Sequence, residues 1–161
     1  MSDIYQTLLI WDVEASPPAG DWTTVLWRDY RKPDQPDNIS IPGLVEDHAE
    51  SLRARFLAWI HQVEEARING KRVVDHLELR PGFSYWWMTS LAQKFNCSET
   101  SQIDNVVKTF VFEDLVSARK PKTIVLVSGN DKLAETLKRF CRKMGLHFRW
   151  NYAQDPETSV T

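Results

Sequence analysis

The sequence predicts an α/β fold of the Rossmann-like, three-layer kind, with a mostly parallel sheet between helices. Short apolar segments alternate along the chain with longer segments whose apolar residues recur at helical spacing. One of the short segments, Thr123–Val127 (TIVLV), is continuously apolar, as expected for an interior parallel strand. The 161 residues, 42% of them hydrophobic, suffice for one domain with its own core. We therefore expect residues 1–161 to form a single domain that ends in a polar tail over 153–161.

The first half of the chain is predicted to contain three strands and one long helix. An apolar strand covers Gln6–Val13, and a second, rich in β-branched and aromatic residues, covers Trp22–Tyr30. Helical spacing then predicts an amphipathic helix over Leu44–Arg67, which Asn69–Gly70 should end because glycine commonly follows a helix C-terminus. A third strand is predicted over Arg72–Leu79.

The second half is predicted to contain three helices and two strands. The helices are Phe83–Phe95, Ser101–Ala118 and Asp131–Met144, and the strands are Thr123–Val127 and Leu146–Tyr152. Because strands that are joined through helices form right-handed crossovers, we expect the strands to be mostly parallel.

Charge and cysteine content exclude several classes of protein. The 20 basic and 22 acidic residues are mixed along the chain and give a net charge of −2, so no basic stripe indicates a nucleic-acid partner. Cys97 and Cys141 have no CxxC partner and are typical of reduced, intracellular thiols. No segment resembles a secretory leader or approaches the roughly 20 apolar residues of a membrane span. We therefore expect a soluble, cytoplasmic protein.

The motifs of common catalytic and cofactor sites are also missing from the sequence. Neither GxGxxG nor GxxxxGK[ST] occurs, so no dinucleotide fingerprint or phosphate-binding loop is predicted. The four histidines lack the HxxxH spacing of metal sites, and GxSxG is absent. No cofactor, metal or catalytic residue is therefore predicted.

Three turns are candidate ligand sites because each follows a predicted strand. In parallel sheets, ligands bind beyond the carboxyl ends of the strands, where helix N-termini offer N–H groups. The candidate ligand-binding residues are Asp12 and Glu14 in the first turn, Arg80, Ser84 and Trp86 in the second, and Ser128, Gly129, Asn130 and Asp131 in the third.

Each candidate also has a purely structural interpretation. Asn130 or Asp131 could simply cap the following helix, and Asp12 and Glu14 could be solvated residues at a strand end. In the second turn, helical spacing places Trp87 in the core and directs Trp86 outward, toward solvent, a cleft or a second lobe. These alternatives stay open at the level of the sequence.

The stretch Phe83–Lys94 (FSYWWMTSLAQK) resembles the N-terminal region of bacterial surface-carbohydrate biosynthesis proteins of O-antigen or capsule gene clusters. The resemblance rests on Trp86–Met88, on Gln93–Lys94 where the family has Glu-Lys, and on the Ile-x-x-Val-Val-Lys pattern of Ile103–Lys108. It covers roughly Leu77 to Arg139. The family is glycosyltransferase-like, with two Rossmann-type lobes, so the resemblance implies the acceptor-side lobe of a larger protein that needs a second, C-terminal lobe.

Two functions follow as hypotheses. The first is the acceptor-side lobe of a glycosyltransferase-like protein, with a sugar or nucleotide sugar as its ligand, inactive alone. The second is a non-enzymatic Rossmann-like module that binds a nucleotide or a protein partner.

Overall fold

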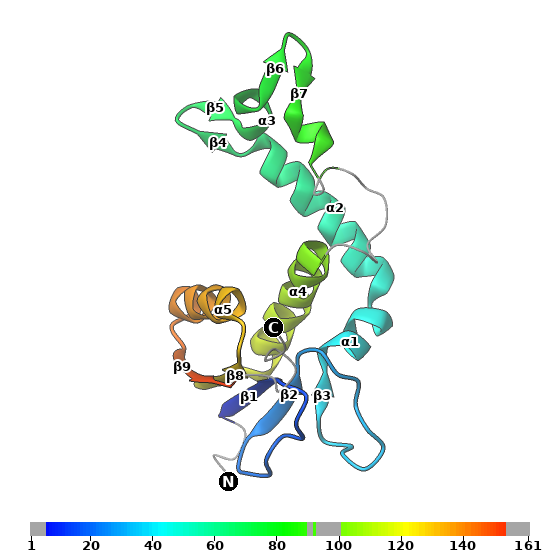
Figure 1. Cartoon of the computed structure of the whole chain (residues 1–161), viewed down its shortest axis with the longest axis vertical. Helices are drawn as coiled ribbons and strands as arrows, with labels where there is room; N and C mark the ends of the chain where they lie inside the picture. The colour runs from blue at the N-terminus through cyan, green and yellow to red at the C-terminus, as the bar shows by residue number, and fades with distance from the viewer. Residues whose placement is uncertain (1–5, 90–91, 93–100, 154–161) are drawn as a thin grey trace, which may run out of the picture. The chain divides into compact units, whose positions relative to one another are not determined.

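The computed structural model describes residues 6–89, 92 and 101–153. Contacts between Cα atoms divide the chain into two compact units, Met1–Glu46 with Val111–Thr161, and Asp47–Phe110. We call the first the sheet unit and the second the hairpin unit (Figure 1). No feature of the sequence indicates this division, and whether the two units act as a single domain stays a prediction.

The sheet unit contains a five-stranded sheet with the strand order β3-β2-β1-β8-β9. All four neighbouring pairs are parallel, which confirms the Rossmann-like α/β class. The strands are β1 (Thr7–Asp12), β2 (Thr23–Leu26), β3 (Ile39–Ser40), β8 (Thr123–Ser128) and β9 (His147–Tyr152). From β1 the chain adds β2 and then β3 on one side, whereas β8 and β9 lie on the other. The strand order therefore reverses between β1 and β8.

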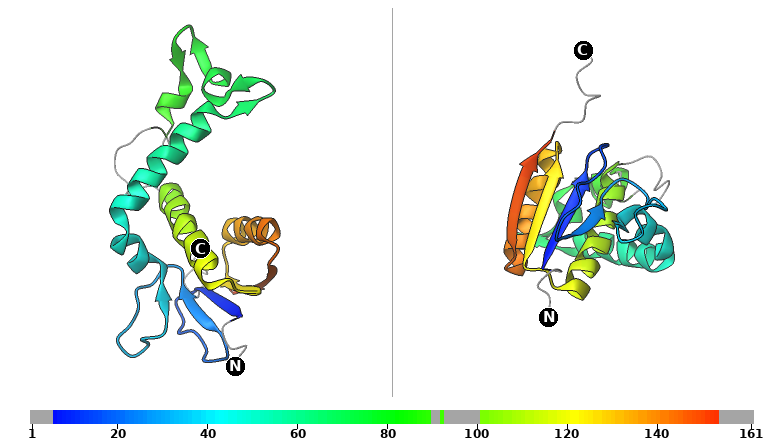
Figure 2. Two further views of the ribbon diagram at one scale, coloured as in Figure 1. Left: turned by 180° about the vertical axis from the view of Figure 1, so that it is seen from behind. Right: turned by 90° about the horizontal axis from the view of Figure 1, so that it is seen from below.

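Two helices cover the sheet on the side where its core is densest. The part of α4 (Ser101–Arg119) that belongs to the sheet unit, from Val111 on, lies on the same side of the strands as α5 (Asp131–Met144) (Figures 1 and 2). On β8, Ile124, Leu126 and Ser128 are fully buried, whereas the residues between them are half-buried. Phe112 of α4 is also fully buried, and its ring lies 5.9 Å from that of Trp27 and 5.6 Å from that of Phe140. The apolar alternation of β8 thus fixes which face carries the main core.

The hairpin unit is built on α2 (Ala49–Glu65), which follows the short helix α1 (Ile41–Asp47). Phe56 and Ile60 of α2 form a core with Val74 and Trp86, and partly buried residues such as Phe110 pack around it. The remaining elements are β4 (Arg67–Ile68), β5 (Lys71–Arg72), α3 (Val73–His76), β6 (Glu78–Arg80), β7 (Phe83–Ser84) and the 3-10 helix η2 (Tyr85–Met88). The pairs β4-β5 and β6-β7 are antiparallel hairpins.

Two predictions for this region are wrong. The predicted strand Arg72–Leu79 does not join the large sheet, because its residues form the end of β5, the helix α3 and the start of β6. Asn69–Gly70 does not follow a helix directly, since α2 ends at Glu65 and these two residues turn the β4-β5 hairpin. Both have positive φ, 51° and 81°, which the two-residue turn of such a hairpin requires and which Asn-Gly favours.

The predicted helix Phe83–Phe95 is wrong over its described part, and the assignment of its tryptophans is reversed. The structure places Phe83–Ser84 in a strand and Tyr85–Met88 in a 3-10 helix. Trp86 is buried at 3% exposure in the core of the hairpin unit, whereas Trp87 is 53% exposed. Ser84 accounts for the change, because its hydroxyl donates to the Val74 carbonyl and accepts from the Trp86 backbone N–H. The tighter helix directs Trp86 inward.

The two tryptophans should therefore respond differently to truncation. Trp86→Ala should lower the free energy of unfolding by about 3–5 kcal/mol, as removal of a large core aromatic does. Trp87→Ala should change it by less than about 1 kcal/mol because the side chain is half-exposed. Urea denaturation followed by circular dichroism measures both values. A larger loss for Trp87→Ala than for Trp86→Ala would contradict the packing described here.

Candidate functional site

The site is centred on Asp12 and Ser128, which lie side by side at the carboxyl ends of β1 and β8. They are register partners in the parallel pair, and the Ser128 hydroxyl donates a 2.6 Å hydrogen bond to Asp12 Oδ2. Asp12 is 4% exposed and Ser128 is fully buried. This is also the point where the strand order reverses, which is where open parallel sheets bind their ligands.

Arg28 supplies the cation that compensates the Asp12 carboxylate. It follows β2, and its Nε donates to Asp12 Oδ1 over 2.9 Å while one terminal nitrogen donates to the Asp12 carbonyl over 3.0 Å. The guanidinium side chain is 38% exposed, whereas the carboxylate side chain is 5% exposed. A buried carboxylate without such partners would be strongly unfavourable, so Arg28 offsets the cost of burying Asp12 at this position.

Ser128 and Asn130 connect this carboxylate to the start of α5. The Ser128 hydroxyl accepts from the Asn130 backbone N–H at 2.9 Å, and Asn130 Oδ1 accepts from the Leu133 N–H at 3.1 Å. Asn130 is thus the N-cap of α5, as its structural interpretation predicts. The Ser128 carbonyl in turn accepts from the Trp150 indole N–H at 2.9 Å. The end of β8, the start of α5 and the end of β9 therefore share one polar network.

The predicted site residues of the first and third turns come together at this edge. Glu14, Gly129, Asn130 and Asp131 are exposed, and Asp12 and Ser128 lie beneath them in the sheet. The positive end of the α5 dipole lies at the same edge, so a polar or anionic ligand would find a favourable field there. Whether these residues bind a ligand stays a prediction.

The residues of the second turn lie elsewhere, in the hairpin unit. Arg80 ends β6 with its guanidinium 5.1 Å from the centre of the Phe83 ring. Ser84 and Trp86 are buried, and the Ser84 hydroxyl bonds to the backbone of its own unit. The first and third predicted turns therefore form the carboxyl edge of the sheet. The second does not, because the strand before Arg80 is not part of the large sheet.

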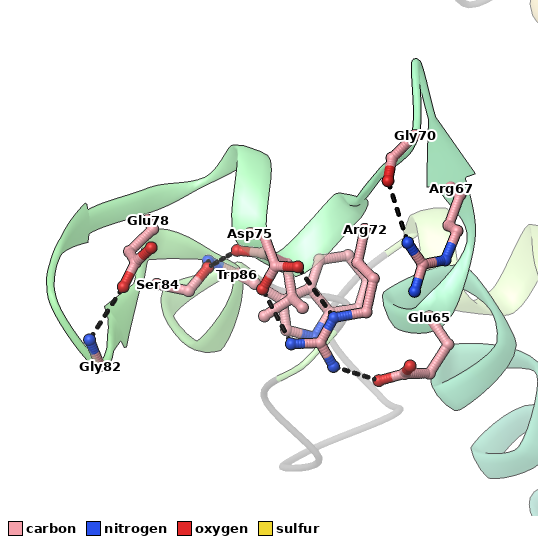
Figure 3. A network of polar contacts seen from close by, with 10 residues as sticks. Glu65, Arg67, Gly70, Arg72, Asp75, Glu78, Gly82, Ser84 and Trp86 are labelled. Atoms are coloured by element: carbon pink, nitrogen blue, oxygen red, sulfur yellow. Dashed lines mark hydrogen bonds and ion pairs between the residues drawn. The ribbon is translucent and has the colours of Figure 1, made fainter.

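Polar side chains of the hairpin unit form a second network, which connects its short elements (Figure 3). Arg72 binds both carboxylate oxygens of Asp75 at 2.8 Å and also reaches Glu65 at 2.9 Å. The hydrogen bonds from Arg72 hold the pKa of Asp75 below its ordinary value. Arg72 on β5 thus pairs with Glu65 on α2 and Asp75 on α3, and because these ion pairs join three elements, we interpret the network as structural.

Arg28 is the site residue that sequence reasoning missed. The predicted strand Trp22–Tyr30 extends past the observed end of β2 at Leu26, so Arg28 was placed inside a strand. Ending that strand before Arg28 would have placed a basic side chain on the carboxyl edge.

Within residues 6–89, 92 and 101–153, no group of three or more His, Cys, Asp or Glu could hold a metal ion. Over the same residues, no helix is long and apolar enough to cross a membrane.

Comparisons with known proteins do not identify a family. No family model matches the chain, and no curated protein or solved structure is significantly similar to it.

The hydrogen bond between Ser128 and Asp12 can be tested by its contribution to stability. Ser128→Ala should lower the free energy of unfolding by about 1–3 kcal/mol, because it leaves an oxygen of a buried carboxylate without its donor. Thr136→Ala is the matched control, since that hydroxyl bonds only to its own helix on an exposed face and its loss should cost under about 0.5 kcal/mol. Equal losses from both variants in chemical denaturation would show that the bond does not hold the edge together.

Proposed function

We propose that the sheet unit binds a hydroxyl-bearing ligand, a sugar or a nucleotide sugar, at the carboxyl edge between β1 and β8. The observation that supports this most is the buried Asp12 carboxylate, held by Arg28 and Ser128 where the strand order reverses. Buried charges are costly, and a fold that needed only a stable sheet would be served by an apolar residue there.

The chemistry of this edge suits a polar ligand better than an apolar one. A carboxylate accepts hydrogen bonds from sugar hydroxyls, and a guanidinium binds phosphate or carboxylate groups through its planar set of N–H donors. The exposed Asn130 and Asp131 at the start of α5 extend the polar surface. Arg28, Asn130 and Asp131 are thus the residues that we propose contact the ligand, and the buried Asp12 holds Arg28 in place beneath it.

Within this proposal, the resemblance to surface-carbohydrate biosynthesis proteins supports an acceptor-side lobe of a glycosyltransferase-like protein. Of the residues that carry it, Trp86–Met88 lie in η2, and Val106–Lys108 lie in α4. Gln93–Lys94 lie outside the described residues. The reaction, the acceptor and the need for a second lobe rest on this resemblance alone, and so do the bacterial origin and the role in polysaccharide synthesis.

A non-enzymatic module that binds a nucleotide at the same edge is the second candidate. It is favoured by the start of α5 at this edge, because helix N-termini bind phosphate groups. The two candidates differ in the part of the ligand that they need. A sugar-binding lobe should discriminate between nucleotide sugars, whereas a nucleotide module should bind a bare nucleotide equally well.

Calorimetric titration tests the proposed edge. Nucleotide hexoses and an acidic glycan should bind the intact chain, and Arg28→Ala should weaken binding by at least about tenfold, because it removes a charged donor. Arg67→Ala is the control, since the exposed Arg67 bonds to the Gly70 carbonyl in the β4-β5 hairpin and should not affect binding. If Arg28→Ala folds normally by circular dichroism and binds as tightly as the unmodified chain, the edge is not the site.

A further inference from the structure

The hairpin unit exposes an unusual number of large apolar side chains over a short segment. Among the described residues, half of the large apolar side chains with high exposure lie between positions 68 and 88. They are Ile68 (55%), Leu79 (67%), Tyr85 (49%), Trp87 (53%) and Met88 (53%). Single exposed apolar residues are common on proteins, but such a concentration indicates an interaction surface.

Each of the two hairpins combines an exposed aliphatic residue with a cation next to its turn. Ile68 and Lys71 are register partners on either side of Asn69–Gly70. Leu79 precedes Arg80, which precedes the turn at Pro81–Gly82. Both hairpins project from the C-terminal end of α2 (Figures 1 and 2). Tyr85 and Trp87 follow directly after the second hairpin.

This segment is basic, although the chain as a whole is acidic. Residues 67–88 contain four Lys or Arg and two Asp or Glu, a net charge of +2, whereas the whole chain has a net charge of −2. Asp75 forms an ion pair with Arg72. Arg72 also pairs with Glu65, and the Glu78 carboxylate accepts from the Gly82 N–H at the second turn, beside Arg80. The uncompensated positive charge therefore lies mainly at the first turn, with Arg67 and Lys71.

We propose that the exposed side chains of this segment, Ile68, Lys71, Leu79, Arg80, Tyr85 and Trp87, dock on an anionic lipid bilayer. Aliphatic side chains at the turns would enter the boundary between headgroups and acyl chains, and tyrosine and tryptophan are the residues that favour that boundary. Lysine and arginine beside them attract anionic headgroups, and this attraction weakens as the salt concentration rises. The complementarity of charge selects a bilayer as the occupant.

The shortness of the two hairpins, whose strands have two or three residues, supports the same choice. A stable interface with another protein buries roughly 800 Å² on each partner, which requires a broad surface. Two narrow turns offer little such area, but projecting turns are well suited to insert among headgroups. This inference goes beyond the ligand site on the sheet and does not depend on which ligand binds there.

Vesicle co-sedimentation of the whole chain tests the inference. Vesicles of phosphatidylcholine with phosphatidylglycerol should bind the protein at low salt, and vesicles of phosphatidylcholine alone should bind it far more weakly. Leu79→Ser combined with Trp87→Ser should reduce binding by at least about tenfold, because both apolar anchors are lost. Arg80→Ala should reduce binding to anionic vesicles by about fivefold. Tyr152→Ser, which removes an equally exposed aromatic from the sheet unit, should leave vesicle binding unchanged.

Two results would overturn the proposal. One is absence of binding to anionic vesicles by the intact, folded chain. The other is binding that the Leu79 and Trp87 substitutions reduce no more than Tyr152→Ser does. As a second measurement, lipids brominated along their acyl chains should quench tryptophan fluorescence in the intact chain, and Trp87→Phe should remove most of that quenching. Ligand titration of the sheet unit is a separate assay, so failure here leaves the proposed function standing, and the reverse also holds.

Discussion

A carboxylate that is almost entirely buried constrains the whole end of the sheet around it. Burying the Asp12 carboxylate is costly unless protein groups replace the water that it loses. Those groups are Ser128, its register partner on β8, and Arg28, which follows β2. Asp12 therefore connects the carboxyl ends of three adjacent strands, β2, β1 and β8. Through Ser128 it is also connected to the start of α5. The position of this network, where the strand order reverses, is the reason to regard it as a site.

The hairpin unit reaches its fold by different means, because it has no extended sheet. Its strands are two or three residues long, so turn chemistry and side-chain bonds to the backbone replace strand pairing as the source of order. The ion pairs of Arg72 connect α2, β5 and α3, and the Ser84 hydroxyl connects β7 to α3. Its core is small and depends on Trp86, whose indole N–H is buried without a partner among the described residues. Such a unit can present side chains on projecting turns while the core of the sheet unit keeps its stability.

The sequence predicted the sheet unit well because its signals are strong and local. The apolar segments at β1 and β8 and the amphipathic α5 match the patterns of buried strands and of a surface helix, and four of the five predicted strands lie in the sheet. The hairpin unit was misread because strands this short have no recognisable periodicity. Asn69–Gly70, the strongest signal of a hairpin turn, was interpreted as a helix end. Spacing alone could not show that η2 is a 3-10 helix, so Trp86 and Trp87 were assigned to the wrong faces. Arg28 was missed because the end of β2 was placed too late, and long-range pairs such as that between Arg28 and Asp12 have no local signature.

Chemical-shift mapping of the backbone amides and arginine Nε–H groups of the labelled chain tests most directly whether the edge between β1 and β8 is a ligand site. With nucleotide sugars or an acidic glycan added, we predict that the largest shifts fall on the amides of Gly129, Asn130 and Asp131 and on the Arg28 side chain. Shifts confined to the opposite edge of the sheet, at Lys122 and His147, or to the turn at Asn69–Gly70 would contradict the account.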